Sequence, residues 1–123
     1  MSLTLSPIIR DLLGAFPTAV SGSMGADITS NYEEVIKHRR VSVQFGWSSG
    51  TSPVGVVSVQ GSNDTDPATA TWHTIAGLSL AVSGNSGSHL LEDPNCGYRW
   101  VRVIYTRTSG TATATIKLIA KEL

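Results

Sequence analysis

The sequence predicts an all-β protein, an antiparallel β-sandwich of about seven or eight short strands. The composition is low in charge, at 15%, and contains 12 glycines, while helix-favouring residues are scarce after residue 40. Segments that alternate apolar and polar residues recur along the chain, and Gly/Ser/Asn-rich turns separate them. No helical segment of the length that a parallel βαβ unit needs lies between them. We expect a jelly-roll-like arrangement, although another sandwich topology fits equally well.

Residues 1–18 are predicted to form an N-terminal arm, helical or extended, ahead of a β-sandwich domain over 19–123. Ser6 and Pro7 are typical of a helix start. Because so short a helix is marginal by itself, its apolar side must be buried. The burial would be either in the domain's own core or against a neighbouring subunit. The apolar residues at helical spacing are Ile8, Ile9, Leu12, Leu13 and Phe16.

The middle of the chain contains the clearest strand patterns. VSVQFGW at 41–47 alternates with Val, Phe and Trp on one side, and VVSVQGS at 56–62 repeats the pattern. Before them, a short strand is expected at 26–29. Ser30 and Glu33 match the capping box of a helical turn.

The second half of the chain continues the same alternation. Its expected strands are 71–75, 78–82, 88–93, 98–108 and 112–121. Gly110 would supply the left-handed residue of a tight turn between the last two strands.

The loop after the second valine strand contains Asn63, Asp64 and Asp66, which could be cation ligands or turn residues. A calcium loop would also need a bidentate Glu nearby, and none follows. We therefore favour the interpretation in which these side chains bond their own backbone. Likewise Trp47, Trp72 and Trp100 could form an aromatic platform, but a core or interface role is favoured.

No catalytic constellation stands out in the sequence, so we expect no enzymatic activity, cofactor or metal. His38, His73 and His89 lack zinc-ligand spacing, and Cys96 has no second cysteine. Nine basic and nine acidic residues give zero net charge, which argues against nucleic-acid or membrane partners. No apolar run approaches the ~20 residues of a membrane span, and no secretion signal is recognisable at the start.

Three arginines on the strand 98–108 are candidate interface residues. Arg is enriched at interfaces because its planar fork pairs with carboxylates and carbonyl oxygens. The candidates are Arg99, Arg102 and Arg107, together with the apolar residues of the arm.

The stretch from VSVQFGW through TSPVGVVSVQGSND, TWHTI and YRWVRVIYTRTSGTATATI, about residues 40–121, resembles small all-β structural proteins of tailed bacteriophage particles. The part with Gly-Ser-Asn-Asp and Trp also looks like carbohydrate-binding sandwiches. The first resemblance implies a virion protein that is made in the host bacterial cytoplasm. It would be a capsid decoration or cement protein that contacts the major capsid protein, other virion proteins and copies of itself as a homo-oligomer. The alternatives are a head–tail connector or tail component, and a module that binds a glycan or receptor.

Overall fold

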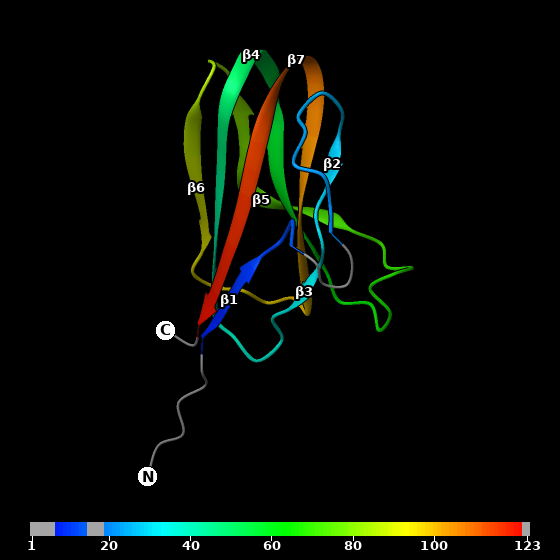
Figure 1. The fold of residues 1–123 in the computed structure, drawn as a ribbon. Helices are drawn as coiled ribbons and strands as arrows, with labels where there is room; N and C mark the ends of the chain where they lie inside the picture. The colour runs from blue at the N-terminus through cyan, green and yellow to red at the C-terminus, as the bar shows by residue number, and fades with distance from the viewer. Residues whose placement is uncertain (1–6, 15–18, 122–123) are drawn as a thin grey trace.

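The structure is a computed structural model that describes residues 7–14 and 19–121, and its regular secondary structure there is entirely β-strand. All strand pairs are antiparallel and belong to one sheet (Figure 1). Within the described residues there is no apolar helix long enough to cross a membrane. The predicted all-β fold class is confirmed. The strands are β1 (Ile8–Asp11), β2 (Ile28–Thr29), β3 (Glu33–Glu34), β4 (Arg40–Ser62), β5 (His73–Val82), β6 (Gly87–Asp93) and β7 (Trp100–Lys121).

The sandwich is a single sheet folded over on itself. β4 and β7 pair from Arg40 opposite Lys121 to Ser62 opposite Trp100, and both turn over together at the end remote from the termini (Figure 1). Layer A consists of β6, the first half of β4, the second half of β7, and β1. Layer B consists of β5, the second half of β4, and the first half of β7 with β2 and β3 at its edge. Two predicted strands therefore join in β4 and two in β7, and the predicted strands 71–75 and 78–82 also form one strand, β5.

Left-handed backbone at three residues makes this bend. Ser49 and Ser52 have φ values of 55° and 48°, and Gly110 has φ 75°. A Cβ at residue 110 would collide with the carbonyl oxygen of Ser52, so only glycine fits between the two bent strands. The predicted left-handed Gly110 is confirmed, but the predicted tight hairpin is wrong. The two halves of β7 do not pair with each other because each half continues its pairing with β4.

The core lies between the two layers and follows the alternation in the sequence. Val43, Phe45 and Trp47 point inward from layer A, and Val57 and Val59 from layer B. Across the core, the ring of Phe45 stacks on Tyr105 with centroids 5.8 Å apart. Trp47 is 6% exposed, and its indole N–H donates to the carbonyl oxygen of Gly84 at 3.0 Å. The core assignment of Trp47 is therefore confirmed.

Two helical expectations are wrong. Ile8–Asp11 is a strand, because the free edge of β7 offers a ladder of hydrogen bonds to an extended segment. The expected capping box does not form either. The Ser30 hydroxyl accepts a hydrogen bond from Val103 N–H at 2.8 Å, and Glu33 lies in β3. The extended form of the predicted arm is thus the one observed, while the division of the chain after residue 18 stays a prediction.

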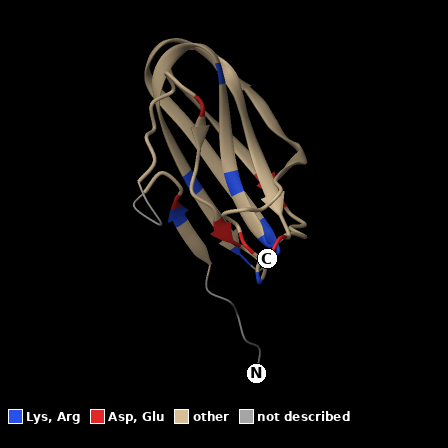
Figure 2. Ribbon diagram, turned by 90° about the vertical axis from the view of Figure 1, so that its right-hand side faces the viewer, with Lys and Arg blue, Asp and Glu red and all other residues tan. Residues whose placement is uncertain are grey.

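Charged residues lie mostly in the half of the sandwich that contains the termini (Figure 2). The bend is built mainly from Ser, Thr and Gly instead. Charged side chains are therefore concentrated at one end of the molecule, away from the bend.

Candidate functional site

The apolar residues of the N-terminal segment are divided between the core and the surface. Leu12 is 1% exposed and belongs to the core, and Ile8 and Leu13 pack against it. Ile9 is 67% exposed. Phe16 lies outside the described residues. Burial in the domain's own core is therefore observed for Leu12, and an interface role for this segment stays a prediction.

Hydrogen bonds and one ion pair fix this segment to the sandwich. Leu12 N–H donates to the carbonyl oxygen of Ile116 at 2.9 Å, and its own carbonyl accepts from Asn31 N–H at 3.0 Å. Arg10 Nε lies 3.4 Å from Glu33 Oε1, which ties β1 of layer A to β3 of layer B. Burial nevertheless raises the pKa of the Glu33 carboxyl, although the charge of Arg10 acts in the opposite direction. The pairing places Ile9 beside its cross-strand partner in β7.

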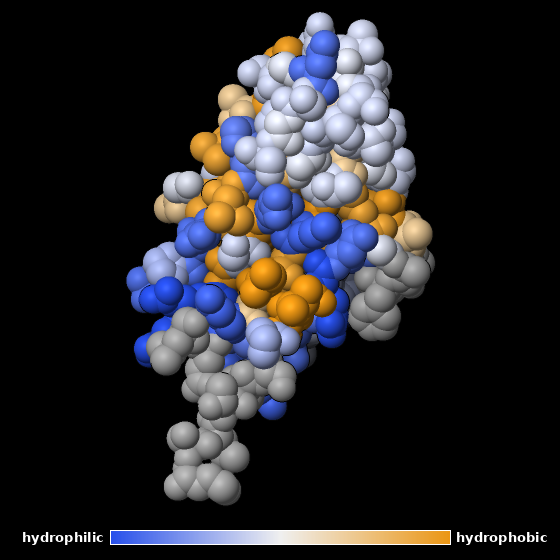
Figure 3. Space-filling model, turned by 60° about the vertical axis from the view of Figure 1, so that its left-hand side comes forward, coloured by the Kyte–Doolittle hydropathy of each residue, from blue (hydrophilic) through white to orange (hydrophobic). Residues whose placement is uncertain are grey.

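The outer surface of layer A carries exposed apolar side chains. Ile9 is paired with Ile119, which is 43% exposed, and Leu90 on β6 is 58% exposed. Figure 3 shows apolar surface on this side of the molecule, with hydrophilic residues between the apolar areas. We call Ile9, Leu90 and Ile119 the layer A face. The part of the chain that the structure describes leaves these three apolar side chains exposed.

The three candidate arginines are placed differently. Arg99 Nε donates to Glu34 Oε2 at 2.8 Å, and its guanidinium lies 5.2 Å from the Trp100 ring centroid. Arg102 donates to Gln60 Oε1 at 2.9 Å, and burial lowers the pKa of its guanidinium. Arg107 lies near the bend, where its Nε donates to the carbonyl oxygen of Gly110. The structure thus gathers Arg99 and Arg102 and leaves Arg107 apart.

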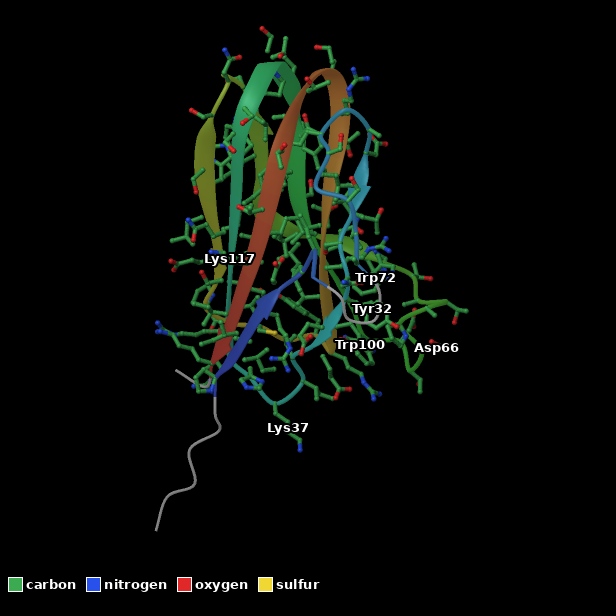
Figure 4. All side chains as sticks on the ribbon, in the orientation of Figure 1. Tyr32, Lys37, Asp66, Trp72, Trp100 and Lys117 are labelled. Atoms are coloured by element: carbon green, nitrogen blue, oxygen red, sulfur yellow. The ribbon has the colours of Figure 1, made fainter. Side chains whose placement is uncertain are left out.

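Aromatic side chains surround the two gathered arginines on the outer surface of layer B. Tyr32 meets Trp100 edge-on at 5.7 Å, and the guanidinium of Arg102 lies 4.4 Å from the Trp72 ring centroid. Figure 4 shows Tyr32, Trp72 and Trp100 on the same side of the molecule. We call these residues with Arg99 and Arg102 the aromatic–arginine face. Tyr32 was not predicted, since it precedes β3 in a segment without a strand pattern.

A pocket of about 520 Å³ lies next to this face, and we call it the polar pocket. It is formed by the end of β4, the start of β5 and the segment between β6 and β7. Asp64, Thr71 and His73 line it from one side, and Asp93 and Tyr98 line it from the other. Sequence reasoning missed this pocket, because its two sides are far apart in the chain and neither contains a recognisable motif.

The predicted turn chemistry at one side of the pocket is observed for Asp64 and Asp66, which accept from the backbone of their own loop, but not for Asn63, whose side chain binds the segment before β7. Asp64 Oδ2 accepts from Thr71 N–H at 2.6 Å, and Asp66 Oδ1 accepts from Ala68 N–H at 2.9 Å. Asn63 Oδ1 accepts from Arg99 N–H at 2.9 Å. In the described part of the chain, no three His, Cys, Asp or Glu side chains are grouped so that they could hold a metal ion.

No family model matches the sequence, and no curated protein is significantly similar to it in sequence. Among solved structures, the chain is similar to the crystal structure of SPBc2 prophage-derived protein YomS. The identity is 13% and the TM-score 0.56, over 98% of this chain and 97% of that chain. A CBM4 structure is less similar, with 13% identity and a TM-score of 0.46 over 78% of this chain and 61% of that one. A chain from the structure of infectious bursal disease virus Gx strain is also less similar. The identity is 8% and the TM-score 0.44, over 94% of this chain and 33% of that chain. The similarity to YomS shows that the two chains share their fold.

Proposed function

We propose that this chain is a non-enzymatic structural protein of a bacteriophage virion, and that it acts as a decoration or cement protein on the head. The observation that carries this proposal is that apolar or aromatic side chains are exposed on both outer sides of the sandwich, where they could contact other proteins. The layer A face offers exposed Ile9, Leu90 and Ile119, and the opposite side offers the aromatic–arginine face. A protein that joins two neighbours in a lattice needs two such surfaces.

The aromatic–arginine face has the composition of a protein contact. Trp, Tyr and Arg are the residues most enriched among those that dominate binding energy in interfaces. Glu34 already pairs with Arg99, so the face is not a strongly cationic surface. With zero net charge over the chain, protein is a better partner for it than nucleic acid.

The fold similarity supports the same proposal. The neighbour that matches over nearly the whole of both chains is a prophage-derived protein. In the proposed role each copy makes modest contacts with the major capsid protein and with other copies of itself. Many such contacts sum through multivalency. A head–tail connector or tail component would use the same two surfaces, and its position in the particle separates it from a decoration protein.

The test compares phage particles with and without this protein. Particles that lack it should release their DNA at a lower temperature, and adding purified protein should restore the wild-type temperature. Cryo-EM of the restored particles should show the protein on the head. Equal thermal survival of both particles would contradict a cementing role, and density on the tail alone would favour the tail alternative.

A pair of variants links the result to the surfaces. Ile9→Asp and Trp72→Ala should each reduce the recovery of thermal stability, because they alter opposite contact surfaces. Thr106→Ala is a matched control, since Thr106 is exposed on β7 and belongs to neither surface. If both contact variants restored stability as fully as the control, the two-surface basis of the proposal would be wrong.

A further inference from the structure

The polar pocket has the size of a small-molecule site. Its volume of about 520 Å³ lies within the usual range of about 300–1,000 Å³ for ligand pockets. Its wall combines an apolar part, Ile75 packed against the core, with an aromatic part, Tyr98. The Tyr98 ring packs directly on the backbone of Gly61, where a Cβ would come within 2.9 Å of the ring. Residue 61 therefore has to be a glycine for the Tyr98 ring to pack in this position.

Hydrogen bonds hold the polar groups of the pocket in place. The Tyr98 hydroxyl donates to Asp93 Oδ2 at 3.0 Å, and Asp93 Oδ1 accepts from Asn95 N–H at 3.0 Å. Burial raises the pKa of the Tyr98 hydroxyl far above its ordinary value, so it remains a donor at neutral pH. On the other side, the bond from Thr71 N–H fixes Asp64. Asp64, Asp93 and Tyr98 are thus held in place before any ligand enters, which lowers the entropic cost of binding.

Several polar groups of the pocket have unused bonding capacity. Within the described residues, the side chains of His73 and Asn95 make no hydrogen bond, and Asn63 uses its oxygen but not its amide N–H groups. Asp64 uses one carboxylate oxygen and leaves the other. The pocket therefore offers both donors and acceptors to a ligand.

The charge of the wall narrows the class of ligand. Asp64 and Asp93 line the pocket, and none of the lining residues is Lys or Arg. Like-charge repulsion disfavours phosphates, sulfates and carboxylates. A sugar ring instead presents hydroxyls that both donate and accept, and a C–H surface that can lie against Tyr98 and Ile75. Hydroxyl donors to carboxylates make strong, charge-assisted bonds.

We propose that the polar pocket binds a neutral saccharide. This function goes beyond the structural role in the virion and does not depend on it. The residues that would contact the sugar are Asn63, Asp64, His73, Asn95 and Tyr98.

The test is an NMR titration of the full chain, labelled with ¹⁵N, with the methyl glycosides of glucose, galactose, mannose and N-acetylglucosamine. We expect saturable shifts of the Thr71, His73 and Tyr98 amides with at least one probe, with Kd on the order of 1 mM. Loss of one hydrogen bond in His73→Ala or Asn95→Ala should weaken binding by roughly fivefold. Both substitutions remove side chains without intramolecular hydrogen bonds among the described residues, so the fold should survive.

Asp66→Asn is the matched control, because Asp66 lies on the same loop and does not line the pocket (Figure 4). It should bind as tightly as the wild type. The proposal is overturned if no probe gives saturable shifts, if the shifts map elsewhere, or if His73→Ala and Asn95→Ala both bind like the control. Shifts at these amides with cadaverine but with none of the sugars would also overturn it, in favour of a cationic ligand. None of these results bears on the proposed virion role, because the thermal stability of phage particles tests that role separately.

Discussion

The guanidinium of Arg102 lies over the ring of Trp72, 4.4 Å from the ring centroid, and is held there by its hydrogen bond to Gln60. Trp72 precedes β5 and Arg102 is in β7, on opposite sides of β4. The pair therefore spans three strands of layer B and fixes the loop before β5 to the outer surface. It also keeps a planar cation partly removed from water at a candidate contact surface.

The Arg102–Trp72 pair should be measurable by a double-mutant cycle. Trp72→Ala, Arg102→Ala and the double variant are expected to show a coupling energy of about 0.5–1 kcal/mol, because the ring attracts the cation. Urea unfolding monitored by circular dichroism gives the free energies. Additive effects of the two substitutions would show that the pair contributes nothing beyond its separate contacts.

Leu12 and Ile9 should respond differently to truncation. Leu12→Ala is expected to lower the free energy of unfolding by about 2–5 kcal/mol, since it empties a fully buried position. Ile9→Ala should change it by at most about 0.5 kcal/mol, because Ile9 is exposed. Thermal and urea unfolding would measure both. Equal losses would mean that Ile9 is as well packed as Leu12.

Three glycines form a graded series for substitution by alanine. Gly97 has open space around it and should tolerate the change with little effect. Gly77 also has space, but its φ of 80° should cost about 1–2 kcal/mol. At Gly110, which also has a positive φ, the new methyl group would in addition collide with Ser52. Gly110→Ala should therefore lower the free energy of unfolding by more than Gly77→Ala. The order of the three unfolding midpoints in urea checks this, and a Gly110→Ala protein as stable as Gly77→Ala would contradict the packing at the bend.

Tyr105→Phe should stabilise the protein. The Tyr105 hydroxyl is buried with no hydrogen-bond partner among the described residues, so its removal relieves an unfavourable desolvation of about 1 kcal/mol. Tyr98→Phe is the opposite case, because that hydroxyl donates to Asp93, and its loss should lower stability by a similar amount. Differential scanning calorimetry should show melting temperatures that move in opposite directions. A lower melting temperature for Tyr105→Phe would count against an unpaired hydroxyl.

Cys96 should react slowly with alkylating agents in the folded protein. Burial raises the pKa of its thiol, so at any pH below that pKa the reactive thiolate is scarcer than in the unfolded chain. The rate of modification by iodoacetamide should increase with pH and then level off once the thiol is fully ionised. It should level off at a higher pH in the native protein than in urea. Identical pH profiles in both conditions would contradict the predicted shift.

Sequence alone predicts the strands whose side chains alternate between core and solvent. Val43 and Phe45 show this pattern, and their inward positions follow directly from it. The bend in β4 is different, because Ser49 and Ser52 adopt a left-handed backbone that serine does not usually signal. The N-terminal segment was also ambiguous. Ile9 and Leu12 have helical spacing, but the edge of β7 imposes the strand.

The polar pocket and the aromatic–arginine face depend on contacts between distant segments. Gly61 at the end of β4 lies against Tyr98 from the segment before β7, and Arg102 meets Trp72 across β4. No local pattern in the sequence predicts contacts between segments so far apart in the chain. Residue type alone identifies the arginines as candidate interface residues, but the side chains that they contact can be identified only from the fold.

The shared strands β4 and β7 have a mechanical consequence. Each contributes one half to layer A and the other half to layer B, so the two layers are joined by continuous backbone as well as by packing. A register shift of one residue in either strand would move its core-facing side chains to the solvent side in both layers at once. Such a shift is therefore very unfavourable. We therefore expect the two layers to unfold together. If neighbouring proteins pull on opposite outer faces, the covalent chain itself resists the force.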